Sequence, residues 1–468
     1  MRLEDIIKGT EATIVEGTPK MEIPAIYCDS RKVTPGSLFI AVNGCSTDGH
    51  KYIEDARKAG AAAVVSADRK ALALCAGNFY GHPSEKLRLV GITGTNGKTT
   101  TVTLLYNLFR SLGYCCGLLS TIANYVGTRR SETENTTADP VTINSLLAEM
   151  VAEGCEYCFM EVSSIGMVQD RVAGLHFSEG IFSNLTHDHL DYHKTFAEYL
   201  RCKKLFFDSL PEDAVAITNI DDRNGQVMVQ NCKARIVTYS CRNMADHTAK
   251  IIEESFDGME LRIDGQDVWT KLIGAHNAYN LLAIYSAAVE LGAAPQEVLV
   301  ALSALESAPG RLETVRGPRG LSVVIDYAHT PDALDNVLKT LRDIAPEKPL
   351  ICLFGCGGDR DRTKRPEMAE IAEKYADRIV VTSDNPRTEN AEGILDEIRK
   401  GFSPKGLAKS LFICDRREAI RTALLTAPQD AAVLLAGKGH ETYQVIGTQK
   451  VHFDEREIIA EVFKTMES

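Results

Sequence analysis

The chain has 468 residues, a formal net charge of −12 and 44% hydrophobic residues, which excludes a disordered chain, a collagen-like chain and a small disulfide scaffold. No apolar run approaches the ~18 residues of a membrane-spanning helix, and the N-terminus shows no signal-peptide pattern. We therefore expect a cytoplasmic protein. The acidic balance argues against nucleic-acid binding, but not against anionic small substrates, which local Arg, Lys and backbone N–H groups can hold.

The pattern of apolar runs and turn residues predicts three domains. Residues 1–86 mix short apolar runs with turns, which indicates a small α/β domain. Residues 87–308 begin with an apolar run, a Gly-rich turn and a stretch with helical spacing of apolar residues. Residues 309–468 follow a Pro-Gly break and form the third predicted domain.

From residue 87 onward, short apolar runs alternate with helical patterns. The predicted strands after the first run, Leu87–Ile92, are Tyr157–Val162, Gly180–Ser183, Ala214–Asn219, Leu321–Asp326, Leu350–Phe354, Arg378–Thr382 and Ala432–Ala436. This alternation is typical of parallel sheets with helices on both faces, so the predicted fold class is α/β. Ligands of such folds bind at the carboxyl ends of the strands.

The strongest motif is a glycine-rich loop between a predicted strand and a predicted helix. Its candidate phosphate-binding residues are Gly94, Thr95, Asn96, Gly97, Lys98, Thr99 and Thr100. They fit a variant of the Walker pattern, in which backbone N–H groups surround phosphate oxygens, Lys98 reaches the β- and γ-phosphates and Thr99 binds Mg²⁺. The alternative is an ordinary Gly-rich turn between a strand and a helix.

Two further segments could supply metal ligands. Glu161 ends an apolar run, and a carboxylate there is a natural Mg²⁺ ligand or, alternatively, a helix cap. Residues 184–193 contain three histidines and two aspartates, which also raises zinc hydrolysis as a rival. Because the chain lacks an H-E-x-x-H helix and has a phosphate loop upstream, we expect one of these histidines to be a ligand and the others structural.

Polar loops follow four predicted strands of the last domain. They are Asp326–Pro331, Gly355–Asp361, Asp384–Arg387 and Gly437–Glu441. Taken singly, each loop fits turn chemistry as well as binding. Together they predict one binding rim, in which Arg360 and Arg387 would clamp a carboxylate through bidentate pairs.

These motifs together resemble the ATP-dependent Mur ligase family of peptidoglycan synthesis, from about residue 24 to residue 445. The resemblance rests on the phosphate loop, the His187–Asp191 run, Asp326–Pro331 and Gly437–Glu441. It implies a UDP-binding N-terminal domain, a central ATPase and a C-terminal Rossmann-like domain. Within the family the chain is most similar to the ligases that join the third residue to UDP-N-acetylmuramoyl-L-alanyl-D-glutamate.

The resemblance also implies site residues. The UDP-substrate residues would be Cys28, Ser30, Cys45, Ser46, Thr47, Asn135, Thr136, Thr137, Ser163, Gln169 and Arg171. ATP would contact the phosphate loop and Asn280, Arg311, Asp326 and His329. The catalytic group would comprise Lys98, Glu161, His187 and Lys203, with Thr99, Glu161, His187 and a carbamate on Lys203 as Mg²⁺ ligands. Lys204 is a second candidate for the carbamate, and Ile165 stands where the family usually has His.

The third-residue amino acid is implied by the Asp384–Arg387 loop, which resembles that of the family members that add meso-diaminopimelate. Diaminopimelate carries a far carboxylate that an Arg can pair, whereas lysine carries none. The implied contacts are Arg360, Asp384, Asn385, Pro386, Arg387, Gly437 and Glu441. ATP and Mg²⁺ would form an acyl phosphate that the amine attacks, in a protein expected to be a monomer.

Four alternatives stay open on the sequence. The same ligase could use L-lysine, or the chain could be another amide ligase of the superfamily, such as a folylpolyglutamate synthase. From other classes, it could be a P-loop ATPase that serves as a switch or motor, or an inactive binding module. The Asp384–Arg387 loop argues against the first three. The last is disfavoured by the intact Lys98, Thr99, Glu161 and His187.

Overall fold

The computed structural model describes residues 1–43, 48–186 and 193–467. The chain divides into two compact units, Met1–Lys250 with Tyr279–Leu302, and Ile251–Ala278 with Ser303–Ser468. No helix in the described ranges is long and apolar enough to cross a membrane. The described cysteines are free thiols.

The first unit opens with a small mixed sheet in the order β1-β4-β3-β2. Its elements are α1 (Leu3–Ile6), β1 (Thr13–Glu16), β2 (Ile26–Tyr27), η1 (Ser30–Lys32), β3 (Leu38–Val42), η2 (Gly49–Tyr52), α2 (Ile53–Lys58), β4 (Ala63–Ala67), α3 (Arg69–Tyr80) and η3 (Pro83–Glu85). Alternate residues of β3 join different core clusters, with Leu38 and Ile40 in one and Phe39 and Ala41 in another. The strand is therefore buried on both faces, as the alternation of side chains along a strand requires.

Within an 11-stranded sheet, the strands from β13 onward run in the order β13-β12-β11-β10-β5-β9-β6-β7-β8. The strands from β13 to β6 are parallel, and β7 and β8 extend the edge antiparallel. The strands are β5 (Arg88–Thr93), β6 (Cys116–Leu119), β7 (Asn124–Val126), β8 (Arg129–Ser131), β9 (Tyr157–Glu161), β10 (Glu179–Phe182), β11 (Val215–Asn219), β12 (Arg235–Ser240) and β13 (His247–Ser255). The helices are α4 (Lys98–Ser111), α5 (Pro140–Ala152), α6 (Ser164–Val168), α8 (Phe196–Asp208), α9 (Gly225–Val229), α10 (Ala275–Glu290) and α11 (Pro295–Ala304).

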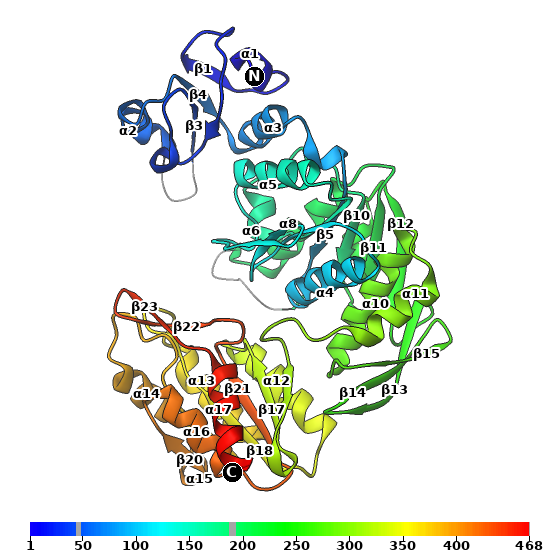
Figure 1. Ribbon diagram of the computed structural model, residues 1–468, viewed down its shortest axis with the longest axis vertical. Coiled ribbons are helices and arrows are strands. Elements are labelled where there is room, and N and C mark those ends of the chain that lie inside the picture. The colour runs from blue at the N-terminus through cyan, green and yellow to red at the C-terminus, as the bar shows by residue number, and fades with distance from the viewer. Residues whose placement is uncertain (44–47, 187–192, 468) are drawn as a thin grey trace. The chain divides into compact units, whose positions relative to one another are not determined.

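The second unit is built on a sheet in the order β16-β17-β21-β18-β19-β20, parallel except for β16. Figure 1 labels β17, β18, β20 and β21 of this sheet. The strands of the unit that lie outside this sheet are β14 (Gly258–Ile263), β15 (Gln266–Thr270), β22 (Tyr443–Ile446) and β23 (Gln449–His452). The strands of the sheet are β16 (Glu313–Arg316), β17 (Ser322–Asp326), β18 (Leu350–Phe354), β19 (Arg378–Val381), β20 (Ser410–Phe412) and β21 (Ala432–Ala436). Its helices are η4 (Pro318–Gly320), α12 (Pro331–Ile344), α13 (Lys364–Tyr375), α14 (Ala391–Arg399), α15 (Pro404–Ala408), α16 (Arg416–Leu425) and α17 (Glu455–Glu467).

Helices cover both faces of this second sheet. On β21, Leu434 packs into a core cluster with residues of α12, α13 and α14, whereas Val433 and Leu435 pack with residues of α16 and α17. Successive side chains of a strand point to opposite faces of the sheet, so a strand that is apolar throughout is buried on both faces. Such strands are typical of a parallel sheet between two layers of helices. The predicted α/β class is thereby confirmed for the second unit.

The predicted strands are confirmed to within two residues at each end. The sequence did not predict β12, β13 or the antiparallel hairpin of β14 and β15. The boundaries between the three predicted domains stay a prediction.

Candidate active site

The phosphate loop connects the end of β5 to the first residue of α4. Gly94 and Gly97 have φ values of 155° and 87°, which favour glycine. A Cβ on Gly94 would lie 1.9 Å from Ser183 Oγ, and one on Gly97 would lie 2.4 Å from Asn280 Oδ1. The loop therefore needs both glycines, and Asn280 lies against it. That Asn280 contacts the nucleotide stays a prediction.

Two lysines reach the same carbonyl of this loop. Lys98 Nζ donates to Gly94 O at 2.9 Å and to Thr95 O at 2.8 Å, and Lys203 Nζ donates to Gly94 O at 2.7 Å. Lys203 is 1% exposed and its Nζ lies 4.7 Å from the centre of the Tyr199 ring. Its neighbour Lys204 instead pairs with Asp208. Of the two carbamate candidates, Lys203 is the one whose amine contacts the phosphate loop.

Glu161 is a buried carboxylate with one oxygen that accepts hydrogen bonds and one that does not. Its Oε1 accepts hydrogen bonds from Thr99 Oγ1 and from Thr121 N, both at 2.8 Å. Its Oε2 is buried and accepts no hydrogen bond from the described residues. Leaving such an oxygen unpaired costs free energy, whereas a hard divalent cation takes carboxylate and hydroxyl oxygens as ligands. Glu161 and Thr99 therefore fit a Mg²⁺ site.

The segment after β10 is bonded to the phosphate loop. Asn184 O accepts from Thr95 N at 2.8 Å, and Asn184 Oδ1 accepts from Asn96 N at 2.9 Å. The predicted ligand His187 and the rest of the run to Tyr192 lie outside the described residues. Among the residues that are described, no three His, Cys, Asp or Glu side chains are grouped to hold a metal ion. His193 is buried and its Nε2 lies 2.9 Å from Ser164 Oγ.

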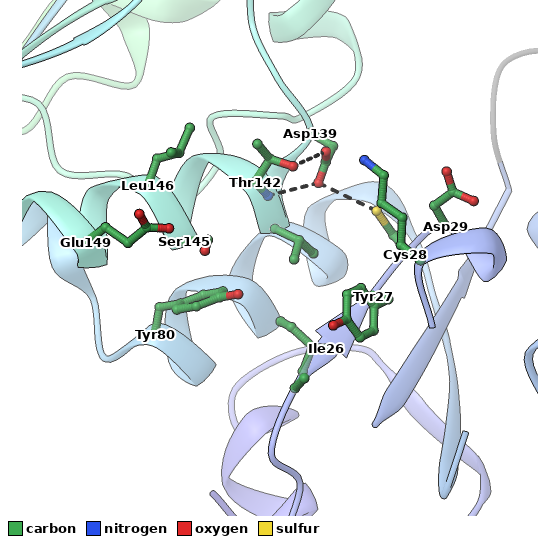
Figure 2. Close-up of a pocket in the computed structure, with 13 residues that line it drawn as sticks. Ile26, Tyr27, Cys28, Asp29, Tyr80, Asp139, Thr142, Ser145, Leu146 and Glu149 are labelled. Carbon is green, nitrogen blue, oxygen red and sulfur yellow. Dashed lines mark hydrogen bonds between the residues drawn. The ribbon is translucent and has the colours of Figure 1, made fainter. Parts of the chain in front are cut away.

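A cavity of about 300 Å³ lies between β2 and α5 in the first unit (Figure 2). Its lining includes Tyr27, Cys28, Tyr80, Asp139 and Thr142. Cys28 Sγ donates to Asp139 Oδ1 at 3.6 Å, and Asp139 caps α5 by accepting from Thr142 N. Burial, and then the Asp139 charge, raise the pKa of the Cys28 thiol. Because Cys28 is one of the predicted UDP-substrate residues, this cavity is the candidate pocket for that part of the substrate.

Several other predicted UDP-substrate residues do not line this cavity or are not described by the structure. Ser30 is in η1 but does not line the cavity, and Cys45, Ser46 and Thr47 lie outside the described residues. Asn135 is exposed.

Thr137 connects the segment before α5 to the Glu161 strand. Its Oγ1 donates to Glu161 O at 2.9 Å and accepts from Ser163 N at 3.0 Å. Its carbonyl accepts from Arg171 Nη1 at 2.6 Å, and Arg171 also bonds to Gln169. The structure thus brings Thr137, Ser163, Gln169 and Arg171 together beside Glu161. Thr136 reaches the same region, because its Oγ1 accepts from Thr121 Oγ1 at 3.1 Å.

The second unit holds the other predicted ATP contacts around the end of β17. Asp326 accepts from Leu312 N and Ala328 N, both at 2.8 Å, and burial raises the pKa of its carboxyl. The Arg311 guanidinium lies 5.1 Å from the centre of the Tyr327 ring, and the His329 ring lies 4.6 Å from it. Burial lowers the pKa of His329, which favours its neutral form. Arg311, Asp326 and His329 therefore form one cluster in this unit.

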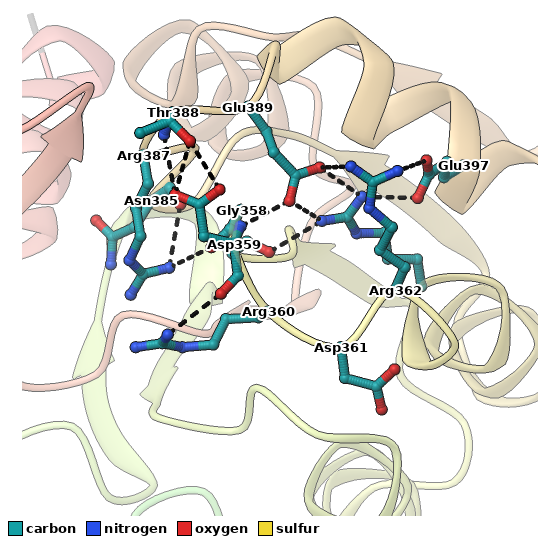
Figure 3. Close-up of polar contacts among 12 residues, drawn as sticks. Gly358, Asp359, Arg360, Asp361, Arg362, Asn385, Arg387, Thr388, Glu389 and Glu397 are labelled. Atoms are coloured by element: carbon teal, nitrogen blue, oxygen red, sulfur yellow. Dashed lines mark hydrogen bonds and ion pairs between the residues drawn. The ribbon is translucent and has the colours of Figure 1, made fainter. Parts of the chain in front are cut away.

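The predicted amino-acid clamps lie at the carboxyl ends of β18 and β19 (Figure 3). Arg360 and Arg387 both lie next to Gly357, where a Cβ would be 2.9 Å from Arg387 Nη1 and 3.8 Å from Arg360 Cγ. Within the described chain both guanidinium groups bond to backbone carbonyls, Arg360 to Asp359 O and Arg387 to Gly358 O, and neither forms an ion pair.

Two neighbouring arginines behave differently. Arg362 and Arg365 each pair with both Glu389 and Glu397. Figure 3 labels Arg362 and the two glutamates. The contrast leaves Arg360 and Arg387 as the arginines of this loop region with charge available for an anion.

The remaining predicted contacts surround a lysine that the sequence analysis did not single out. Asn385 Nδ2 donates to Glu441 Oε2 at 2.8 Å, and buried Lys438 bonds to Asn385 and pairs with Asp384 and Glu441. Pro386 is buried, and Gly437 has a φ of 114° and donates its N–H to Asp326 O. Lys438 lies inside the Gly437–Glu441 motif that the sequence analysis named. The contacts of its side chain could not be predicted from the sequence, because Asp384 and Asn385 lie in another loop.

Comparison with known proteins defines the class of this site. Residues 22–92 match the model of the Mur ligase family catalytic domain, residues 92–288 the Mur ligase middle domain, and residues 310–439 the Mur ligase glutamate ligase domain. The chain belongs to the Mur ligase family, whose members are ATP-dependent ligases.

Similar proteins narrow the class further. UDP-N-acetylmuramoyl-L-alanyl-D-glutamate–2,6-diaminopimelate ligase of Cytophaga hutchinsonii is 49% identical over 484 residues, covering 100% of both chains. The ligase of the same name from Parabacteroides distasonis is 48% identical over 486 residues, again with 100% of both chains covered. A solved structure of a ligase of that name has a TM-score of 0.73 at 32% identity, over 100% of this chain and 99% of the other.

A more distant structure supports the fold alone. The folylpolyglutamate synthase of Thermotoga maritima has a TM-score of 0.62 at 15% identity, covering 79% of this chain and 90% of that one.

Proposed function

We propose that the chain is the ATP-dependent ligase that joins meso-2,6-diaminopimelate to the D-glutamate of UDP-N-acetylmuramoyl-L-alanyl-D-glutamate. Full-length relatives of that name at 46–49% identity support it. The observation that carries the choice of amino acid is the charge of Arg360 and Arg387, which no carboxylate among the described residues pairs, beside a rim that contains Asp384 and Glu441. Diaminopimelate presents both a carboxylate and an ammonium at its far end, which such a rim can bind together.

The first step is transfer of the γ-phosphoryl group of ATP to the D-glutamate carboxylate, which gives an acyl phosphate and ADP. The backbone of the Gly94–Gly97 loop and the positive end of α4 hold the phosphates, as at other helix N-termini. Lys98 Nζ and Lys203 Nζ both donate to Gly94 O of this loop. The Lys98 ammonium would balance the negative charge that develops on the transferred group, whereas a carbamate on Lys203 is an anion and would serve as a Mg²⁺ ligand. Thr99, Glu161, His187 and a Lys203 carbamate would hold Mg²⁺, which when bound neutralises phosphate charge.

The second step is attack of the diaminopimelate amine on the acyl carbon. The amine loses a proton, the carbon–nitrogen bond forms and inorganic phosphate leaves from the tetrahedral intermediate. Water must be kept from the acyl phosphate, because hydrolysis would waste ATP. The reaction consumes cytoplasmic ATP and a nucleotide-linked precursor, so we place it in the cytoplasm, with the protein acting as a monomer.

The runner-up is the same ligase with L-lysine as its amino acid. Lysine would leave Arg387 without a carboxylate partner, and an unpaired buried or half-buried charge weakens binding. We therefore expect lysine to be a poor substrate rather than an equal one.

The test measures amide product and phosphate release with ATP, Mg²⁺ and the nucleotide precursor, adding meso-diaminopimelate or L-lysine in parallel. The expected result is product that requires the precursor and strongly prefers diaminopimelate. Equal use of lysine would overturn the choice of amino acid but leave a ligase of this family. ATP turnover that needs neither the precursor nor an amino acid would overturn the ligase itself in favour of a switch-type ATPase.

A further inference from the structure

Lys438 is a buried cation at the centre of the candidate amino-acid rim. Its residue is 0% exposed. Its Nζ lies 3.0 Å from Asn385 Oδ1, 3.1 Å from Glu441 Oε2 and 3.4 Å from Asp384 Oδ1. The resemblance assigns those three partners to amino-acid binding, but it assigns nothing to Lys438. A buried ammonium is tolerated only where paired groups of this kind surround it.

The charges of this cluster do not cancel. One ammonium faces two carboxylates, whose side chains are 9% exposed at Asp384 and 13% exposed at Glu441. Asp384 Oδ1 is buried and accepts no hydrogen bond within the described chain, although Lys438 forms an ion pair with it. Counted over these three side chains, the cluster carries one excess negative charge in a poorly solvated place, which a second cation would compensate.

The backbone beside Lys438 is fixed by the hairpin of β22 and β23. Val445 N donates to Asn385 Oδ1 at 2.9 Å, and Gln444 Nε2 donates to Asp384 O at 2.6 Å. Asn385 Oδ1 thus accepts two donors, one from Lys438 and one from the hairpin, which uses both of its lone pairs. Because the hairpin holds the loop independently, loss of Lys438 would change the charge and the side-chain orientations more than the course of the backbone.

We propose that Lys438 is a positioning residue for the amino-acid substrate. It holds Asp384, Asn385 and Glu441 in one arrangement and offsets one of their two charges, so that the remaining charge receives the far ammonium group of the substrate. Arg387, 2.8 Å from Gly358 O and unpaired with any described carboxylate, takes the far carboxylate. The proposal rests on the function proposed above and adds the residue that sets the charge of its rim.

The experiment compares Lys438→Met, Lys438→Ala and Lys438→Arg by chromatographic assay of the amide product. For Lys438→Met we expect KM for diaminopimelate to rise at least ~30-fold, as when one partner of a buried charge pair is truncated, with kcat reduced less than ~5-fold. KM for ATP and for the nucleotide precursor should stay within about twofold, because the Lys438 side chain bonds to Asp384, Asn385 and Glu441 and to none of the predicted ATP or UDP contacts in the described chain. Lys438→Arg keeps the charge and should fall between wild type and Lys438→Met.

Chemical rescue separates a charge role from a merely structural one. Propylammonium should lower the KM of Lys438→Ala, because that variant leaves room for a primary alkylammonium, and should not change that of Lys438→Met, which fills the space. Assay of the diaminopimelate product rather than phosphate excludes signal from direct attack by the added amine. Lys409→Ala is the matched control, since Lys409 Nζ bonds only to the Glu373 and Ala376 carbonyls among the described residues of the same unit.

Three results would overturn the proposal. They are a KM for diaminopimelate within twofold of wild type in Lys438→Met, an equal rise of KM for all three substrates, and no response of Lys438→Ala to propylammonium. Failure of the proposed function is a different outcome, since it appears in the wild type as product made with another amino acid. The Lys438 variants are then measured with that amino acid, and the same three results decide.

Discussion

The candidate phosphate site and the candidate amino-acid rim differ in the chemical groups that form them. In the first unit, the phosphate site consists of backbone amides, hydroxyls and two lysines that bond to one carbonyl, Gly94 O. In the second unit, the amino-acid rim depends on ion pairs between side chains, those of buried Lys438 with Asp384 and Glu441, and buried Arg365 and Arg416 form further ion pairs in the same unit. A site of the first kind should lose rate on substitution without losing stability, whereas substitution in a charge network should affect selectivity or stability.

Lys98 gives the largest expected effect. Lys98→Met should lower kcat by about 10³-fold, because it removes a cation where phosphoryl charge develops. Thermal unfolding should change little, since the two carbonyls that Lys98 bonds also belong to a loop that other contacts hold. Lys58→Met, which removes an exposed lysine of the same unit, is the control. A kcat within tenfold of wild type would contradict the proposed role.

Glu161→Gln tests the metal site next. Gln keeps an acceptor for Thr99 and Thr121 but replaces the unpaired Oε2 with an amide, so the fold should persist. We expect activity to fall by about 100-fold at low Mg²⁺ and to recover partly as Mg²⁺ rises, while chelation with EDTA abolishes activity in both proteins. The measurement is a Mg²⁺ titration of product formation, with exposed Glu153→Gln as control. An unchanged titration would place the metal elsewhere.

Substitution of Arg387 tests whether the amino-acid rim selects diaminopimelate over lysine. Arg387→Ala should reduce the preference for diaminopimelate over lysine by about 100-fold, the equivalent of one charge-assisted pair. Arg362→Ala removes a neighbouring arginine that is already paired with Glu389 and Glu397, and should leave the preference unchanged. The ratio of kcat/KM for the two amino acids is the readout, and equal losses in both variants would remove the special position of Arg387.

Arg416 tests whether buried charge holds the second unit together. Arg416→Met leaves Glu455, which is 1% exposed, without its partner, and should destabilise the protein by about 3–5 kcal/mol. The exposed pair of Arg417 and Glu461 is the control, where Arg417→Met should cost about 0.5 kcal/mol. Urea unfolding gives both values. Similar losses would show that burial of the Arg416 pair carries no extra weight.

The smallest expected effect is a pH dependence at Glu389. Hydrogen bonding to Arg365 lowers the pKa of the Glu389 carboxyl from 4.5 to about 2. A carboxyl whose folded pKa lies below its unfolded value stabilises the fold above the unfolded pKa, and that stability is lost as pH falls through the folded pKa. The stability difference between wild type and Glu389→Gln should therefore shrink between pH 4.5 and about 2. A difference that is constant over this range would contradict the pairing.

The sequence predicted the backbone-built site better than the side-chain network. The spacing of Gly94, Gly97, Lys98 and Thr99 is itself the signal, because a phosphate loop is a local turn between one strand and one helix. Asn280 was predicted from the resemblance and does lie against Gly97. Lys438 and Gln444 were not singled out, since their partners Asp384 and Asn385 are more than fifty residues away in the chain.

Local sequence patterns also predicted some elements of the fold better than others. Strands of the parallel sheets were predicted because they are short, continuous apolar runs between turn residues, as Leu350–Phe354 and Ala432–Ala436 are. The strand β13 has the burial of a half-exposed strand and carries Lys250 and three acidic or polar residues at its end, so its sequence lacks that signal. The Cys28 cavity likewise could be predicted only in part, because Asp139 and Tyr80 reach it from two helices.

In the proposed mechanism, ATP phosphorylates the precursor carboxylate to give an acyl phosphate. The most direct measurement uses precursor labelled with oxygen-18 in the D-glutamate γ-carboxylate, together with ATP, Mg²⁺ and diaminopimelate, and analyses the released phosphate by mass spectrometry. If the acyl phosphate forms, each phosphate carries one labelled oxygen from the carboxylate. Unlabelled phosphate would mean that water attacks ATP directly, and would contradict the ligase mechanism.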